Sequence, residues 1–254
     1  MSTNAPTTPT PESLAEQLDY LKLPFMLEQH ATLAKQAAQE HWDHLAYLAR
    51  LVAGEAALRR ERSVQRRITQ AHFPVIKTLE QFQWSWPKSI NRMQVQHLFR
   101  LQFLADKGNV IFLGTVGLGK THLATALGYA ACLQGLSVRF TTAVEVINAL
   151  AAAQRAKRLK QALDNYRKPA LLILDELGYL PIDKTGADLL FQIISLRYEQ
   201  GSTIVTSNRA YKHWAEIFNN DATLTSALLD RLLHHAETVL IEGQSYRMKD
   251  RIES

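Results

Sequence analysis

The sequence lacks the features that define several large classes of proteins. It has one cysteine, Cys132, so no disulfide can form within the chain and a disulfide-stapled fold is excluded. Cys132 lies in an apolar helical pattern and is expected to be a small buried residue. No uninterrupted apolar run is long enough to span a bilayer, and the segment MSTNAPTTPTPES lacks the basic and apolar parts of a signal peptide. We therefore expect a soluble, cytoplasmic protein with no membrane partner.

Strong charge of either sign is also missing. The 254 residues carry 29 Lys and Arg against 24 Asp and Glu, a formal net charge of +5. This mild basicity permits a polyanionic partner without requiring one. Hydrophobic residues make up 46% of the chain, which is ordinary for a globular protein. The length allows one large domain or a core domain with a smaller one.

Glycine is scarce, but three of the 11 glycines gather in one loop. The pattern G-x-x-x-x-G-K-T spans residues 114–121, after the apolar run NVIFL and before the helical stretch THLATALGYAACL. A phosphate-binding loop requires this context, because backbone N–H groups and the start of the helix converge on an anion. Lys120 is expected to reach the β- and γ-phosphates, and the Thr121 hydroxyl to ligate Mg²⁺. The predicted nucleotide-binding residues here are Gly114, Gly117, Leu118, Gly119, Lys120, Thr121 and His122.

A second chemical pattern is ALLILDELGYLPID, in which an apolar strand ends in Asp175 and Glu176. On its own, such a pair is more often the cap of a turn. Together with a phosphate loop, it suits a nucleotide site at the carboxyl edge of a parallel sheet. Asp175 would hold Mg²⁺ opposite Thr121, and Glu176 would orient the water that attacks the γ-phosphate. A base candidate beside the metal carboxylate favours hydrolysis over the phosphate transfer of a small-molecule kinase.

Two further polar residues stand near the ends of predicted strands. Asn208 follows STIVTS, where its amide would touch the γ-phosphate or the attacking water, although asparagine is also a common turn residue. Arg231 lies in the apolar helical pattern SALLDRLLHHAE, shortly before another strand. There it would either face the γ-phosphate of a neighbouring subunit or make an ordinary surface salt bridge. The predicted catalytic residues are Lys120, Asp175, Glu176, Asn208 and Arg231.

Five apolar strands alternate with helical stretches in the C-terminal part of the chain: NVIFL, SVRFT, ALLIL, STIVTS and ETVLI. This alternation predicts an α/β fold with a five-stranded parallel sheet between helices. The expected organisation is a disordered tail at 1–11, a small all-α domain at 12–72, a linker at 73–90 and the ATPase domain at 91–254. Three linker aromatics would either line an adenine pocket or pack the linker onto the next domain: Phe82, Trp84 and Trp86.

Histidine pairs occur twice, as His41 with His44 and as His234 with His235. Neither pair has a cysteine or a third ligand near it in the sequence, as a zinc site requires. We expect these histidines to be surface or packing residues.

The motifs GTVGLGKT, LLILDELGYLP, TIVTSNR, LLDRLLHHAE and GQSYR occur in this order and together resemble the AAA+ ATPases of the helicase-loader and initiator branch. From about Leu79 to Met248 the chain most resembles the IstB family, the ATP-binding helpers of insertion-sequence transposition. The resemblance implies a P-loop AAA+ fold that binds ATP and Mg²⁺ and self-assembles on double-stranded DNA, as a ring or a helical filament. It also implies that the protein delivers target DNA to a cognate transposase and stimulates strand transfer.

Residue roles follow from the same resemblance. Asp175 and Glu176 take the Walker B roles, and Asn208 takes that of sensor 1. Arg231 becomes a finger that acts on the neighbouring subunit, and Arg247 of SYR becomes a sensor-2-like arginine.

The sequence departs from the pattern of AAA+ proteins in two places. Thr115 and Val116 stand where many phosphate loops have a proline, but the glycines and the lysine remain, so nucleotide binding is still expected. Too few residues follow Asn208 for the usual helical lid. The loader branch is similarly truncated, so we expect a reduced or absent lid, and the role of Arg247 stays open.

Two basic segments are candidates for DNA contact. LRRERSVQRRI has five arginines against one glutamate, and AAAQRAKRLKQALDNYRK has six basic residues against one aspartate. Most charge runs are solvated helix surfaces, but the resemblance places the second segment on an extra helix that faces a central channel. Contacts to phosphate carry no sequence information, so binding should be non-specific and salt-sensitive. The predicted DNA-binding residues are Arg59, Arg60, Arg66, Arg67, Arg155, Lys157, Arg158 and Lys160.

Two alternatives stay open. A replicative helicase loader would have nearly the same ATPase core and would differ in what its N-terminal domain binds. An ATP-licensed DNA-binding scaffold would assemble in the same way with negligible turnover.

Overall fold

The structure, a computed structural model, describes residues 11–246. Residues 1–10 of the predicted tail and Arg247, the predicted sensor-2-like residue, lie outside the described part of the chain. The chain divides into two compact units, Met1–Gln65 and Arg66–Ser254. The four domain boundaries drawn from the sequence stay a prediction.

The N-terminal unit is helical, and its second helix starts at a buried carboxylate. Its elements are α1 (Pro11–Tyr20), α2 (Pro24–Gln39) and the first part of α3 (His44–Ala71). Proline suits the first position of α2, because an N–H there would have no partner within the helix. Glu55 of α3 accepts a hydrogen bond from the Phe25 N–H at 2.9 Å and so faces the positive end of the α2 dipole. Within residues 11–246, no helix combines the length and the apolar character needed to cross a membrane.

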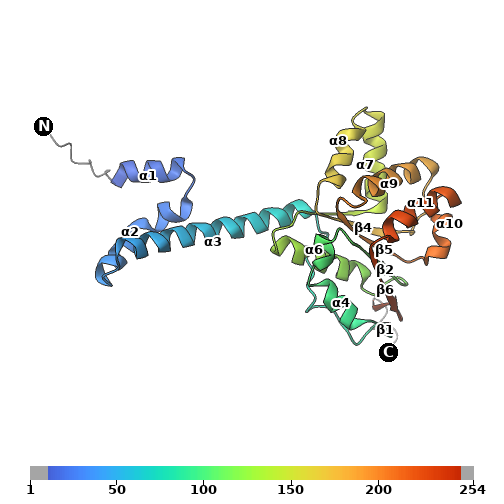
Figure 1. Ribbon diagram of the computed structural model, residues 1–254, viewed down its shortest axis with the longest axis horizontal. Coiled ribbons are helices and arrows are strands. Elements are labelled where there is room, and N and C mark those ends of the chain that lie inside the picture. The colour runs from blue at the N-terminus through green and yellow to red at the C-terminus, as the bar shows by residue number, and fades with distance from the viewer. Residues whose placement is uncertain (1–10, 247–254) are drawn as a thin grey trace. The chain divides into compact units, whose positions relative to one another are not determined.

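The C-terminal unit is built on a six-stranded sheet with the order β1-β6-β2-β5-β4-β3 (Figure 1). The strands are β1 (Ser89–Ile90), β2 (Asn109–Leu113), β3 (Val138–Thr142), β4 (Leu171–Leu177), β5 (Ser202–Ser207) and β6 (Ala236–Glu242). The parallel pairing of β2 to β6 confirms the predicted α/β fold. The expected count of five strands was wrong, because β1 pairs antiparallel with the end of β6. Its two residues are too few for any periodicity to reveal.

Helices cover both faces of the sheet, as a parallel sheet requires. Leu172 and Leu174 of β4 belong to the core beneath α7, α9 and α11, whereas Ile173 between them contacts Gly128 of α6. Because successive strand residues point to opposite faces, α6 packs on the other side (Figure 1). The helices of this unit are α4 (Arg92–Leu98), α5 (Gln102–Ala105), α6 (Lys120–Leu133), α7 (Ala143–Arg155), α8 (Leu159–Arg167), α9 (Lys184–Arg197), η1 (Tyr211–His213), α10 (Trp214–Ile217) and α11 (Ala222–Leu233).

One buried cation ties together the amino ends of β4 and β5. Arg197 at the end of α9 is only 2% exposed, and its guanidinium donates to the carbonyls of Tyr166, Pro169 and Ser202. Burial lowers the pKa of Arg197 to about 10, which still leaves it charged at neutral pH. The arginine therefore fixes where these two strands begin, and so where their opposite ends meet the phosphate loop.

Candidate nucleotide site

The phosphate loop joins β2 to α6 at the carboxyl edge of the sheet. Gly117 and Gly119 have φ angles of 80° and 86°, a left-handed conformation that residues with a Cβ rarely adopt. A Cβ at Gly117 would also clash with the Ser245 side chain. These two glycines are therefore needed for the loop to turn and to bring the start of α6 to the pocket described below.

Lys120 begins α6, and its side chain folds back over the loop. It is 5% exposed, and its ammonium donates to the carbonyl oxygens of Gly114 and Thr115, both at 2.7 Å. A buried charge needs such acceptors because leaving water is costly. The positive charge is thus held where a bound anion would meet it.

The Asp175 carboxylate lies at the centre of a small hydroxyl network. The Thr121 hydroxyl is 3.0 Å from each carboxylate oxygen, and the Thr206 hydroxyl donates to Oδ1 at 2.5 Å. Asp175 is 3% exposed, and this burial raises its pKa, while the two hydroxyls and Lys120 act in the opposite direction. The structure thus brings together Thr121 and Asp175, as the metal prediction requires. Thr206 was missed, since a threonine inside a buried strand matches no motif.

Glu176 leaves the strand by an irregularity in the pairing. The register between β4 and β5 shifts between Leu174 and Leu177, and Glu176 has a φ of 61°. This conformation is uncommon for a residue other than glycine and concentrates at functional sites. The Glu176 N–H donates to the Thr206 hydroxyl at 3.0 Å, while the side chain is exposed and lines the nucleotide pocket. One threonine therefore holds both acidic residues.

Asn208 directly follows β5, in the strand next to β4. Its side-chain carbonyl oxygen is buried and has no hydrogen-bond partner within residues 11–246. A buried acceptor without a partner is rare in folded proteins and often marks a position for water or a ligand. The amide is thus available beside the end of β4, although Asn208 is not among the residues that line the pocket.

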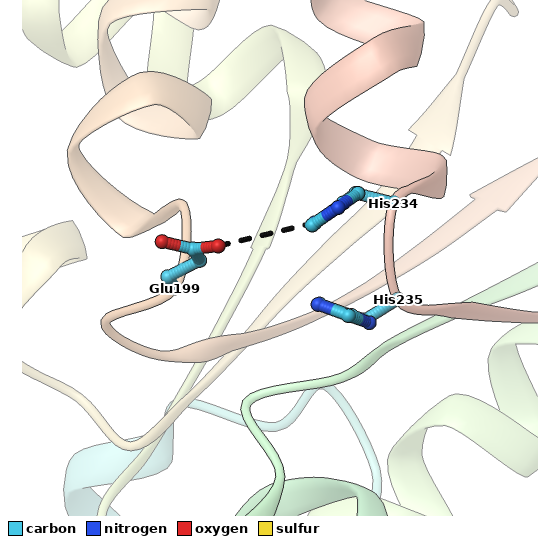
Figure 2. Close-up of side chains that lie close together, drawn as sticks. All are labelled: Glu199, His234 and His235. Carbon is cyan, nitrogen blue, oxygen red and sulfur yellow. Dashed lines mark ion pairs between the residues drawn. The ribbon is translucent and has the colours of Figure 1, made fainter.

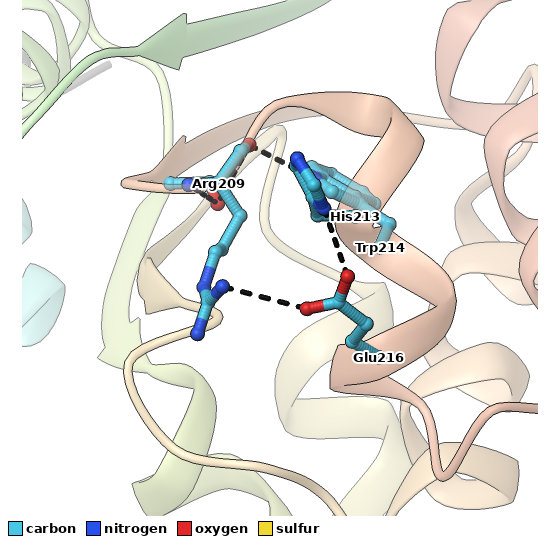
Figure 3. Close-up of polar contacts among 5 residues, drawn as sticks. Arg209, His213, Trp214 and Glu216 are labelled. Atoms are coloured by element: carbon cyan, nitrogen blue, oxygen red, sulfur yellow. Dashed lines mark hydrogen bonds and ion pairs between the residues drawn. The ribbon is translucent and has the colours of Figure 1, made fainter.

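A polar cluster anchors the chain after Asn208 (Figure 3). The Trp214 indole donates to the Arg209 carbonyl at 3.0 Å, and Glu216 pairs with His213 at 2.8 Å and with Arg209 at 3.5 Å. The bond from His213 lowers the pKa of Glu216. Because Trp214 is fully buried, this cluster ties the Asn208 turn to the core.

The pocket beside the loop has a volume of about 560 Å³, enough for a nucleotide. Phe82 and Trp86 line it, while Trp84 packs edge-on against Phe82 with ring centroids 4.9 Å apart. Both interpretations of the linker aromatics thus hold in part. Tyr246, which the sequence did not single out, lies 5.6 Å from Trp86 between ring centroids and donates its N–H to the Gly117 carbonyl.

His122 attaches the aromatic segment to α6. Its Nε2 lies 2.8 Å from the Thr78 carbonyl, and its ring packs edge-on against Phe82 at 5.5 Å. Burial lowers the pKa of His122, so the ring is neutral at pH 7 and donates to Thr78 through this nitrogen. The predicted nucleotide residues Leu118 and His122 therefore line the pocket together with the glycines and Lys120.

Arg231 is not among the residues that line this pocket. It lies in α11, where its guanidinium donates to the Ala227 carbonyl at 2.9 Å and stands 4.9 Å from the Phe191 ring centroid. The surface salt bridge considered from the sequence is therefore not its observed contact. A role toward a neighbouring subunit stays a prediction.

The predicted DNA-binding residues fall into two groups. Arg155, Lys157, Arg158 and Lys160 lie at the turn between α7 and α8, and all four are exposed. The other group lies along α3, with Arg59 and Arg60 in the N-terminal unit and Arg66 and Arg67 in the C-terminal one. Arg59 is partly engaged, because it pairs with Glu55 at 3.5 Å and donates to the Lys22 carbonyl.

A family model described as IstB-like ATP binding protein matches residues 16–254. The chain belongs to this family. A relative from Bacillus thuringiensis subsp. berliner, named as an ATP-binding protein of insertion sequence IS232, is 39% identical over 94% of this chain and 95% of its own length. One from Pseudomonas aeruginosa, named for IS21, is 39% identical over 92% of this chain and 88% of its own length. The IstB-like chain is thus an ATP-binding helper protein of insertion sequences.

Solved structures agree on the fold. AMPPCP-bound DnaA from Aquifex aeolicus superimposes with a TM-score of 0.57 at 22% identity, over 72% of this chain and 55% of that one. The DnaC helicase loader gives a TM-score of 0.53 at 20% identity, over 65% and 96% of the two chains. At such identities the likeness shows the AAA+ fold alone. It confirms the fold class of this IstB-like chain and the branch named from its motifs.

Proposed function

We propose that this IstB-like protein is a Mg²⁺-dependent ATPase that self-assembles on double-stranded DNA, delivers target DNA to a partner transposase and stimulates it. The observation that carries the proposal is the convergence of Lys120, Thr121, Asp175 and Glu176 at one edge of the sheet, held together by Thr206. Family membership supports the insertion-sequence setting.

The first step is the capture of a triphosphate. Phosphate oxygens would replace the carbonyls of Gly114 and Thr115 as acceptors for the Lys120 ammonium, and a charged acceptor makes the stronger bond. Phe82 and Trp86 offer ring faces and edges on which an adenine would pack. Binding in this arrangement orders the phosphates without covalent chemistry by the protein.

A magnesium ion fits the oxygen donors beside the loop. The Thr121 hydroxyl and the Asp175 carboxylate lie 3.0 Å apart, and Mg²⁺ prefers oxygen ligands and keeps several waters. Thr121 would ligate the ion directly and Asp175 through its water shell. Bound there, the ion would neutralise phosphate charge and favour the ionised form of a carboxyl whose pKa burial raises.

Hydrolysis is assigned to Glu176 with Asn208. The bulge that gives Glu176 its positive φ turns its carboxylate into the pocket, where it would orient and polarise the attacking water. The unpaired carbonyl oxygen of Asn208 would hold that water or, through its amide nitrogen, touch the γ-phosphate. Thr206 keeps the two acidic residues in register.

Assembly is assigned to Arg231 and the exposed basic residues. Arg231 would leave the Phe191 ring and face the γ-phosphate of the neighbouring copy, so that ATP holds the copies in a ring or a helical filament. The four cations at the α7–α8 turn would follow the DNA backbone without reading its sequence. Hydrolysis then loosens the assembly and acts as a switch.

The test is Glu176→Gln, with Glu242→Gln on the exposed end of β6 as its matched control. A base of this kind contributes roughly 10²–10⁴-fold to rate, so Glu176→Gln should lose hydrolysis by that factor, keep ATP and remain on DNA. Phosphate release and DNA retention measure the two effects. Wild-type hydrolysis by Glu176→Gln refutes the assignment, and turnover near zero in the wild type, with and without duplex DNA, favours the scaffold alternative.

The partner separates the transposition helper from a helicase loader. Pull-down of the transposase encoded beside this gene, against a replicative helicase, should retain the transposase alone. Retention of the helicase instead would move the protein to the loader class. The match to the IstB-like family across residues 16–254, which includes the N-terminal helices, supports the first outcome.

A further inference from the structure

Three side chains with metal-binding atoms meet outside the nucleotide site, and we propose that they bind a borderline divalent cation, with Zn²⁺ as the expected ion. They are Glu199, His234 and His235 (Figure 2). Within residues 11–246, this is the one group of three or more His, Cys, Asp or Glu side chains close enough to share an ion. One donor atom of each lies within 4.8 Å of the other two.

The donors come from two turns that the sheet holds side by side. Glu199 lies in the turn between α9 and β5, where a φ of 56° reverses the chain, and the histidines connect α11 to β6 (Figure 2). The His235 carbonyl accepts a hydrogen bond from the Asn109 N–H at 2.7 Å, at the start of β2. Because both turns are anchored to neighbouring strands, the spacing of the donors is set by the fold.

The donor set suits zinc. Imidazole nitrogens and a carboxylate oxygen bind Zn²⁺ at about 2.0–2.2 Å, whereas Mg²⁺ prefers oxygen alone. Tetrahedral bonds of that length place donor atoms about 3.4 Å apart, so the three side chains must close by roughly 1 Å. Glu199 and His234 are 56% and 47% exposed, so rotation of their side chains displaces no core packing. Water would complete the coordination.

Existing contacts already orient the site. Nδ1 of His234 lies 4.0 Å from a Glu199 carboxylate oxygen and 3.1 Å from the Tyr198 hydroxyl, and the two imidazole centroids are 4.1 Å apart. A histidine that binds a metal usually has its other ring nitrogen held by a hydrogen bond. Tyr198 would supply that bond once His234 turns toward the ion.

The bound ion would join two elements that are distant in sequence. It would clamp the end of α9 to the turn after α11, the helix that carries Arg231 one turn before His234. A ligand that binds only the native state raises the midpoint of thermal unfolding. The inference uses no residue of the nucleotide site and does not depend on hydrolysis.

The experiment is calorimetric titration of the full-length, tag-free chain with ZnCl₂, in excess Mg²⁺. The expected result is one Zn²⁺ per chain, an increase in the thermal midpoint and at least tenfold weaker binding by Glu199→Gln and by His235→Ala. The matched control is His41→Ala in the other histidine pair, which should bind as the wild type does. With Co²⁺ in place of Zn²⁺, visible absorption should change in Glu199→Gln, as loss of a ligand requires.

Unchanged affinity in both ligand variants would overturn the proposal, as would the absence of saturable Zn²⁺ binding. Loss of binding in His41→Ala alone would place the ion at the other histidine pair and overturn it too. Far-UV circular dichroism checks that each variant is folded. Because the three side chains are exposed, we expect all variants to keep the wild-type spectrum.

Discussion

Asp175→Asn should make the protein more stable while it stops metal-dependent hydrolysis. The buried carboxylate is unfavourable for folding because burial raises its pKa against the effect of its hydrogen bonds. Asparagine has nearly the same shape and carries no charge. Its amide can still accept from the Thr206 hydroxyl and interact with that of Thr121, so no polar group loses its partner.

The size of the effect follows from two opposing terms. Removing a carboxylate from water costs several kcal/mol after relaxation. Two hydroxyl bonds to the charged group return about 1.5–3 kcal/mol each, and Lys120 adds to them. The difference is about 1 kcal/mol in favour of the neutral side chain, or about 2–4 °C in the midpoint of thermal unfolding for a chain of this size.

The sign with pH is fixed by the raised pKa. Between the pKa of the unfolded aspartate and that of the folded one, the native state binds more protons, so stability falls as the pH rises through this range. The advantage of Asp175→Asn should therefore be complete well above the folded pKa. It should shrink as the pH falls toward about 4, the ordinary value for aspartate.

The assay is differential scanning calorimetry without nucleotide or Mg²⁺, at pH 8 and at pH 4.5. The control is Asp188→Asn, an exposed position in α9 that should change the midpoint by about 1 °C or less. A lower midpoint for Asp175→Asn at pH 8, or a difference that does not shrink in acid, would refute the reasoning about the buried charge.

Three further predictions concern the other parts of the account. Thr206→Val should lose about 2 kcal/mol in denaturant unfolding and most phosphate release, because Asp175 and the Glu176 N–H both lose a partner; Thr141→Val in β3 is the control, and equal losses there would contradict it. Charge reversal at Arg155 and Arg158 should weaken duplex DNA binding and flatten its salt dependence, measured by anisotropy; unchanged affinity removes this surface from the account. Arg231→Ala should spare nucleotide binding and abolish cooperative phosphate release; a monomer that hydrolyses ATP as fast as any assembly argues against the role in trans.

The core of the site could be predicted because its parts lie next to regular elements. The phosphate loop and Asp175 each follow an apolar strand, and the carboxyl ends of parallel strands meet at one edge of a sheet. Local sequence thus specifies both the residue types and the place where they converge. The hydrogen bond between Thr121 and Asp175 is the direct result.

Other parts could not be predicted because they depend on contacts between distant segments. Thr206 looks like any strand threonine until β5 is placed beside β4, and the two residues of β1 are defined only by their pairing with β6. The distribution of Phe82 and Trp86 around the pocket follows irregular chain, where no periodicity guides the interpretation.

The histidine pair shows the same limit from the opposite side. From the sequence, His234 and His235 lacked a third ligand and were set aside as surface residues. Glu199 lies far from them in the chain and is brought near by the turn before β5. A ligand set assembled by two turns has no spacing rule that a sequence can reveal.

The central claim is that ATP held at Lys120 and Asp175 is hydrolysed when the protein assembles on DNA. The most direct test is steady-state phosphate release by the full-length protein at saturating ATP and Mg²⁺, with and without duplex DNA. The account predicts release that rises with DNA and with protein concentration, and that disappears in Glu176→Gln. Release that is independent of DNA and survives in Glu176→Gln would contradict it.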